Sequence, residues 1–405
     1  MKRLILLLFL LSFASASDNF GYSRVSVERV WTIEGPVGSS IDFTGSLVVN
    51  NSNQHIISIT TDPGIDYETN KDGVVTIHYQ GELNSTKMVL KATALVNVDY
   101  DTNILSDAPL PENNLSFTNL TEPNEEIETE ARLLAEKDST LNTIANMANW
   151  VNDYLEYDLA CWGEVNPAQV VFEEQRGVCV EFSHLFISMA RSAGLETRYV
   201  SGYVLAPSWQ PHAWVEVNVP GYGWLPVDPT FNQAGILDSS HVAMNYGDDQ
   251  STSYDILLTD NTAVTMTAQN TVTEAFSNED PKGILLSIDF DNETYIVDVS
   301  ITNERPEYVF GTYVVSLPEG YGTDSSSIML LSPDENTHRY YGFNRSLFDD
   351  GYTYSVPIYA SFNDARDDTT ITISTNDAPK PAADVPKPCA VSLFLLCILC
   401  ARVLH

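Results

Sequence analysis

Apolar and polar positions tend to alternate along the first hundred residues of the chain. Segments such as SLVVN, HIISIT and MVLKATALVNV carry this pattern, and Gly, Pro and Asn stand at the breaks between them. A period of two is typical of strands that bury one face. Residues 17–110 are therefore predicted to form an N-terminal β domain of the sandwich type.

The apolar positions take up a helical period after residue 124. Helices are predicted over residues 125–137, 139–158, 166–174 and 179–193. In the last of these, apolar side chains recur at helical spacing from Cys179 through Phe182, Phe186 and Met189, and Gly194 supplies the stop. Cys179 is therefore expected to be the first residue of its helix and to begin the buried stripe.

The period returns to two behind that helix. Strands are predicted over residues 197–204, 212–219 and 223–228, and the last two are joined by the turn PGYG. Residues 124–250 thus form one mixed domain of helices and strands. Short alternating segments over residues 255–375 predict a C-terminal β-sandwich domain, and a Pro-rich linker is expected over residues 376–388.

Both ends of the chain carry targeting patterns. Residues 1–16 combine a basic head, an apolar run and a small-residue site, which predicts a secretory signal peptide. In the hydrophobic tail, residues 389–405, the apolar run is shorter than the roughly 20 residues of a transmembrane helix. We expect this tail to be a sorting or membrane-anchoring signal, kept or cleaved, and the alternative is a short helix packed on the domain.

Asn-x-Ser/Thr sequons agree with export and glycosylation; they lie at Asn50, Asn84, Asn114, Asn119, Asn292 and Asn344. The predicted location is therefore the cell surface or the extracellular space. A net charge of -35, from 55 acidic and 20 basic residues, excludes nucleic acid as a partner. The sequence does not determine the oligomeric state.

The cysteines do not form a disulfide framework. Three of the five lie in the tail, which leaves Cys161 and Cys179 in the body of the chain. These two could pair with each other in an oxidising compartment. We expect no metal and no cofactor, because the chain has neither the Asp spacing of a calcium loop nor a Cys/His cluster of the zinc type.

Three residues have the types and order of a thiol catalytic triad. A thiol at the first turn of a helix faces the positive end of the helix dipole, which stabilises the reactive thiolate of Cys179. Such a nucleophile needs a base and a group that orients the base. Folding the predicted hairpin about Gly221 brings His212, at the head of one strand, to within about one position of Asp228 on the other.

Strand alternation places His212 on the face that also carries Trp214, and the apolar residues between them on the opposite face. His212 is therefore expected on a wet or cleft face, where a base can reach substrate. Glu181 and His184 are expected on the solvent side of the cysteine helix, with His184 as an ordinary surface residue.

These segments resemble the transglutaminase-like superfamily. The resemblance rests on RGVCVEFSHLFISMARSAGLETRYVSGYV, HAWVEV and GYGWLPVDPTF, and it is greatest to exported prokaryotic and archaeal members. It implies an α+β fold with a papain-like core, here flanked by two all-β sandwich-like domains. It also implies that Cys179 is the nucleophile, His212 the general base and acid, and Asp228 the residue that orients His212, with the Cys179 backbone N–H in an oxyanion hole.

The function that these patterns predict is an exported cysteine acyl-transfer enzyme acting on an extracytoplasmic protein or peptide. A carboxamide or peptide carbonyl would form a thioester with Cys179, and the acceptor would be an amine in a transglutaminase or water in a protease or amidase. The alternative from a different class is a non-enzymatic cell-surface scaffold. A disulfide between Cys161 and Cys179 would hold the enzyme inactive until it is reduced.

Overall fold

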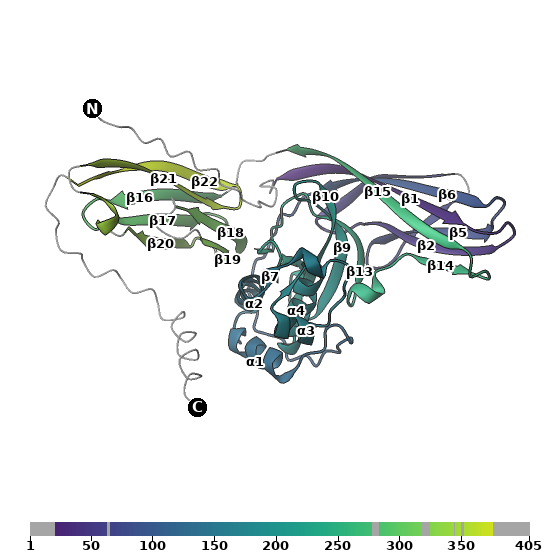
Figure 1. The fold of residues 1–405 in the computed structure, drawn as a ribbon. Coiled ribbons are helices and arrows are strands. Elements are labelled where there is room, and N and C mark those ends of the chain that lie inside the picture. The colour runs from purple at the N-terminus through teal and green to yellow at the C-terminus, as the bar shows by residue number, and fades with distance from the viewer. Residues whose placement is uncertain are drawn as a thin grey trace.

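The computed structural model describes residues 21–62, 65–277, 283–317, 325–343, 345–349 and 352–375. They form an α+β molecule in which a central domain of helices and strands lies between two β-sandwiches (Figure 1). The predicted fold class is confirmed. The expected signal peptide, the Pro-rich linker and the hydrophobic tail lie outside the described residues.

The N-terminal sandwich consists of two four-stranded antiparallel sheets. Its apolar side chains alternate with outward-facing ones along each strand, as the period of two predicts. The first sheet has the order β15-β1-β6-β3, with bounds Thr265–Ser277, Tyr22–Glu34, Lys87–Val98 and Gln54–Thr61. The second has the order β14-β2-β5-β4, with bounds Ile256–Thr259, Ser40–Val49, Val74–Glu82 and Asp66–Thr69.

The structure corrects the boundary that was expected at residue 255. Strands β14 and β15 do not belong to the C-terminal sandwich, because β14 pairs with β2 and β15 pairs with β1 along its whole length. Alternation identifies a strand but does not say which sheet it joins. The chain therefore returns to its first domain after the central domain is complete.

The central domain contains four helices, one five-stranded antiparallel sheet and one pair of two-residue strands. The helices are α1 Glu125–Leu134, α2 Thr140–Tyr154, α3 Ala168–Glu174 and α4 Cys179–Ser192. The sheet has the order β12-β11-β10-β9-β13, with bounds Gln233–Ala234, Gly223–Asp228, Trp209–Val219, Thr197–Leu205 and Val242–Gly247. Before α4, β7 (Glu156–Tyr157) pairs with β8 (Arg176–Gly177) in parallel.

The helix ends follow the sequence signals. Ser139 caps α2 by accepting a hydrogen bond from the Asn142 N–H, which satisfies one of the free donors of the first turn. Helix α4 begins at Cys179 and ends just before Gly194, whose φ of +87° is easy for a residue without a Cβ. The thiol therefore sits at the N-terminus of a helix, as predicted.

Both faces of the central sheet are covered. One face packs on α4, and Ala213, Val215 and Val217 belong to the core that the helices share. The other face packs on the N-terminal sandwich, because Trp214 and Val200 belong to the same apolar cluster as the first strands of the chain. This face is therefore buried against a neighbouring domain at Trp214, whereas His212 itself lines a cleft, one of the two positions expected for it.

The C-terminal sandwich contains a three-stranded and a four-stranded sheet. The first has the order β16-β17-β20, with bounds Ile284–Asp291, Ile296–Asn303 and Asn336–Gly342. The second has the order β19-β18-β21-β22, with bounds Ser325–Leu331, Val309–Ser316, Thr353–Phe362 and Ala365–Ser374. The Asn149 side chain joins this sandwich to α2 by bonding both the N–H (2.7 Å) and the carbonyl (2.9 Å) of Ile328.

Among the described residues, the structure contains no helix with the length and apolar character that crossing a membrane requires.

Candidate active site

The β10–β11 hairpin brings His212 and Asp228 together. Val215 lies opposite Val227, so His212 and Asp228 are diagonal neighbours on one face of the pair. The Nε2 atom of His212 is 2.7 Å from Oδ2 of Asp228, and both side chains are buried. The hairpin folds about Gly221 as expected, but its register sets His212 two positions, rather than about one, from the residue opposite Asp228.

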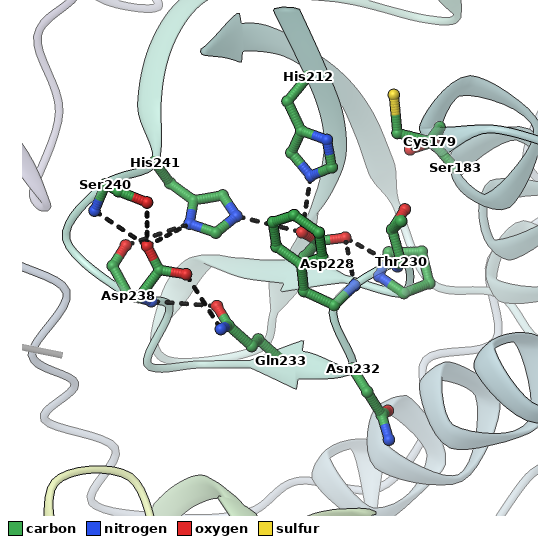
Figure 2. A network of polar contacts seen from close by, with 12 residues as sticks. Cys179, Ser183, His212, Asp228, Thr230, Asn232, Gln233, Asp238, Ser240 and His241 are labelled. Carbon is green, nitrogen blue, oxygen red and sulfur yellow. Dashed lines mark hydrogen bonds and ion pairs between the residues drawn. The ribbon is translucent and has the colours of Figure 1, made fainter. Parts of the chain in front are cut away.

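Cys179 approaches His212 from the helix side. Figure 2 shows its sulfur beside the His212 ring, on the side away from Asp228, and the nearby thiol contributes to the raised pKa of His212. Because His212 uses Nε2 for Asp228, Nδ1 is the nitrogen left for the thiol. The three residues named from the sequence thus lie in one line, with His212 in the middle.

The line opens into a cleft of about 420 Å³. Cys179 and His212 line its floor, although only 4% and 7% of their surfaces are exposed. Trp162 also lines the cleft and is 56% exposed, so it forms an outer wall rather than part of the core. The sulfur of Cys179 is therefore accessible from the cleft, although little of its surface is exposed.

Asp228 accepts four hydrogen bonds. Its Oδ1 accepts from the backbone N–H groups of Thr230 (2.8 Å) and Phe231 (3.2 Å), and its Oδ2 faces His212 and His241. Donors on both oxygens favour the ionised carboxylate. Burial alone would raise the Asp228 pKa, but the charges of His212 and His241 and the hydrogen bonds from their rings hold it well below its usual range.

The charge on Asp228 acts on the base in turn. Burial lowers the pKa of His212, but the charge and hydrogen bond of Asp228, followed by the contact with Cys179, outweigh it and raise the pKa to about 10. At neutral pH the imidazole is then protonated and can pair with a thiolate. Such a pair is the arrangement that thiol activation requires.

Two expectations for the cysteine helix are wrong. Glu181 and His184 are fully buried, because α3 and the segment around Asn166 cover the side of α4 that was expected to face solvent. Glu181 accepts hydrogen bonds from the N–H groups of Val178 (3.0 Å) and Asn166 (3.2 Å). It therefore fixes the backbone directly in front of Cys179.

Both cysteines of the body are free thiols. The disulfide between Cys161 and Cys179 that the sequence left open is absent from this structure. The Cys179 backbone N–H belongs to the first turn of α4, where helical N–H groups lack an intrahelical partner. It is available to an oxyanion next to the sulfur, as the resemblance implies.

Sequence analysis did not identify His241. It lies just before β13, is fully buried, and contacts Asp228 through Nε2 at 3.1 Å. His212, Asp228 and His241 place ligand-type atoms within 4.8 Å of one another, a spacing that can hold a metal. Each of these atoms is already engaged in the hydrogen bonds given above, so we assign the three to a hydrogen-bond network.

Comparison with known proteins places the central segment in a family. The sequence pattern of the transglutaminase-like superfamily matches residues 127–229. Over 125 residues the chain is 27% identical to an uncharacterised protein of Mycobacterium leprae, covering 29% of this chain and 44% of that protein. Over 75 residues it is 33% identical to a protein-glutamine gamma-glutamyltransferase of Pseudomonas aeruginosa, covering 16% and 11%. The chain thus spans less than half the length of these curated relatives.

Among solved structures, a candidate cysteine protease from Cytophaga hutchinsonii is 18% identical, with a TM-score of 0.46. The match covers 65% of this chain and 93% of that one. The matched family segment contains Cys179, His212 and Asp228. Residues 127–229 of the central domain therefore match the transglutaminase-like superfamily.

Proposed function

We propose that this protein is an exported cysteine acyl-transfer enzyme that acts on carboxamide or peptide carbonyls through a thioester. The observation that carries the proposal is the buried line from Cys179 through His212 to Asp228, which ends at a cleft. A nucleophile, a base and an orienting carboxylate in this order meet the requirements of thiol catalysis.

In the first half-reaction, the Cys179 thiolate adds to the carbonyl carbon and the carbonyl electron pair moves onto oxygen. The Cys179 backbone N–H donates to that oxyanion. When the carbonyl re-forms, the C–N bond breaks and the His212 imidazolium gives its proton to the departing nitrogen. Ammonia leaves from a primary carboxamide, or an amine from a peptide, and the acyl group stays on sulfur.

In the second half-reaction, neutral His212 takes a proton from the incoming acceptor as the acceptor attacks the thioester. The C–S bond breaks, and the thiolate and imidazolium are restored. Asp228 keeps the Nε2–H tautomer of His212 throughout, so that Nδ1 faces the sulfur. An amine acceptor gives a new amide bond, and water gives a carboxylic acid.

The predicted signal peptide and the sequons support export, and the apolar tail supports attachment to a membrane. Protein or peptide substrates outside the cytoplasm fit this location. The chain has a net charge of -35, so cationic partners are drawn to its surface more readily than anionic ones.

The deciding experiment uses the full chain, a glutamine-rich protein and a tagged primary amine. We expect the tag to enter the protein and Cys179→Ala to abolish its uptake, because the thioester cannot form without the sulfur. Cys161→Ala is the matched control, because Cys161 is equally buried but lies outside the line. It should retain full uptake.

Each other outcome selects a different function. Cleavage of the protein or release of ammonia without tag uptake, dependent on Cys179, would make the enzyme a protease or amidase. If Cys179→Ala changed neither uptake nor cleavage, and the thiol reacted no faster than Cys161, the proposal would fail in favour of a cell-surface scaffold.

A further inference from the structure

His241 is a second histidine partner of the active-site carboxylate. Its Nε2 is 3.1 Å from Asp228 Oδ2, the oxygen that also faces His212 Nε2 at 2.7 Å. Figure 2 shows the two imidazoles on different sides of Asp228, with His241 on the side away from Cys179. His241 is fully buried and does not line the cleft, so it cannot touch substrate itself.

The partners of His241 determine its protonation state. Its Nδ1 is 3.1 Å from the backbone carbonyl of Asp238 and 3.3 Å from the Oδ1 atom of the same residue. A carbonyl has no hydrogen to give, so Nδ1 must carry the proton. An ionised Asp228 at Nε2 is likewise only an acceptor, so Nε2 must carry one as well. His241 is then an imidazolium.

Asp238 is held in place independently of His241. Its carboxylate accepts hydrogen bonds from Gln233 Nε2 (3.1 Å), from the Ser240 N–H (3.0 Å) and from the Ser240 hydroxyl. Gln233 Oε1 accepts from the Asp238 N–H at 3.0 Å, which closes the loop. The orientation of His241 is therefore fixed before any substrate arrives.

We propose that His241 is a positioning residue of this site: its imidazolium, anchored by Asp238, keeps Asp228 ionised and in place so that Asp228 can orient His212. The positioning role of His241 rests on the function proposed above, whereas the positive charge of its ring does not. Without the positive ring, Asp228 and Asp238 would be two carboxylates buried together, and one of them would take up a proton.

The surroundings of His241 support this charge. The charged or titratable groups that face it are Asp238 from its own loop, Asp228 from the end of β11, His212 from β10 and Tyr100, whose hydroxyl donates to the His241 carbonyl at 3.1 Å. Burial lowers the pKa of His241, but the Asp238 charge and the bond to Asp228 outweigh it and raise the pKa to about 9. The Trp214 and Phe231 rings contact the imidazole in edge-on geometry.

The test measures Cys179 alkylation by iodoacetamide against pH, mapped to the peptide, in the full chain. His241→Gln keeps a donor but removes the charge, so Asp228 is protonated at mildly acidic pH and no longer stabilises imidazolium on His212. We expect the pH of half-maximal alkylation to rise by about one unit, with a rate about tenfold lower at pH 5 and little changed at pH 8.

A second variant distinguishes the loss of the His241 charge from a change in packing around residue 241. In the double variant His241→Gln with Asp238→Asn, only one carboxylate remains buried, and we expect the half-maximal pH to return to within about 0.3 unit of the wild-type value. His184→Gln is the control, because His184 is also fully buried but its Nε2 accepts a hydrogen bond from the Gln250 N–H, so the ring is neutral and carries no charge to lose. It should leave the half-maximal pH unchanged.

Three results would overturn the proposal: an unchanged profile in His241→Gln, an equal shift in the double variant, or the same shift in His184→Gln. If His241→Gln does not fold, nitrogen NMR of the wild-type histidines decides, because His241 should remain an imidazolium at pH 8 and a neutral ring there would refute the inference. Alkylation needs no acyl substrate, so failure of the proposed function would appear separately, as absent tag uptake.

Discussion

The His212 ring is constrained on several sides, and this constraint is what turns three side chains into a site. Asp228 holds Nε2, and Phe231 stacks on the ring face with centroids 4.8 Å apart and planes 14° apart. Trp214 follows His212 on the same face of strand β10, and the centroids of the two rings are 6.0 Å apart. With rotation blocked, Nδ1 stays directed to the thiol of Cys179, and no ordering remains to be done when substrate binds.

The variant Asp228→Asn tests whether Asp228 acts by orienting the His212 ring or only by filling space beside it. The amide keeps the volume but presents an N–H₂ group that cannot accept from His212, so the ring loses its tautomer and its charge stabilisation. We expect kcat/KM for tag uptake to fall about 10²–10⁴-fold. Asp158→Asn, which alters a half-exposed ion pair with Arg176, is the control and should cost less than about threefold. Retained activity in Asp228→Asn would exclude an orienting role.

The high pKa of His212 predicts the basic limb of the pH profile. In the proposed mechanism the imidazolium is the proton donor to the leaving group, so activity is expected below its pKa and should be lost as the pH rises through about 10. Asp228→Asn should move this limb toward the ordinary value of 6.5, because the charge that raises the pKa is gone. A limb that stays in place in that variant would contradict the assignment.

The positions of Cys179, His212 and Asp228 could be predicted from the sequence, because each depends on local structure. A helix start places the cysteine, and a tight hairpin places the histidine and the aspartate. The sequence was insufficient for His241, whose role depends on how the loop after β12 folds back onto Asp228. It was also insufficient for Glu181 and His184. Their polarity suggested a surface, but a third layer of chain covers that side of α4.

Among the elements, β9 must approach its neighbours closely at the level of the site. Gly202 lies opposite His212 in the β9–β10 pair, and a Cβ at residue 202 would lie 2.1 Å from the Val242 carbonyl oxygen and 2.6 Å from the Trp214 ring. Backbone and a fully buried indole cannot yield easily. Glycine is therefore required where three strands of the central sheet meet the cleft.

Gly202→Ala should destabilise the protein by at least about 2 kcal/mol through overpacking. Urea unfolding followed by tryptophan fluorescence would measure the loss. Gly342→Ala is the matched control, because Gly342 is also a strand glycine but a Cβ there meets nothing within 4 Å. Equal stability of the two variants would show that the sheet can relax around residue 202.

The whole molecule is organised around a chain that leaves the N-terminal sandwich and later returns to it. Asp255, just before β14, forms a largely buried ion pair with Arg29 of β1 at 2.8 Å and also accepts from Trp31 Nε1 at 2.7 Å. These bonds lock the returning segment to the first strand. The sandwich in turn covers the His212 face of the central sheet, so its integrity bears on the site.

Asp255→Ala should cost about 3 kcal/mol, because it removes the only carboxylate among the described residues that pairs with the largely buried Arg29 charge. Asn270 and the Ser46 carbonyl still accept hydrogen bonds from Arg29. Hydrogen exchange of the β1 amides would localise the loss to the N-terminal sandwich. Glu34→Ala, which breaks the exposed pair with Lys87 on the same sheet, should cost under about 1 kcal/mol. Similar protection losses in the two variants would refute the locking role.

The domain plan was predictable only in part. Helical and alternating periods identified the three regions and the elements of the central one, because each period reflects local burial. The predicted boundary at residue 255 was wrong, because strands that pair with partners far away in the sequence show no local signal of that pairing. Strand β15 pairs with β1 although the whole central domain lies between them in the sequence.

The central claim is that His212 activates Cys179, and the two body thiols of one chain test it directly. Cys161 and Cys179 are both free and both 4% exposed, so burial does not distinguish them. At pH 6, iodoacetamide should alkylate Cys179 about a hundredfold faster than Cys161, because only Cys179 has an imidazolium partner. His212→Ala should reduce Cys179 to the rate of Cys161. Equal rates in the wild-type protein would contradict the account.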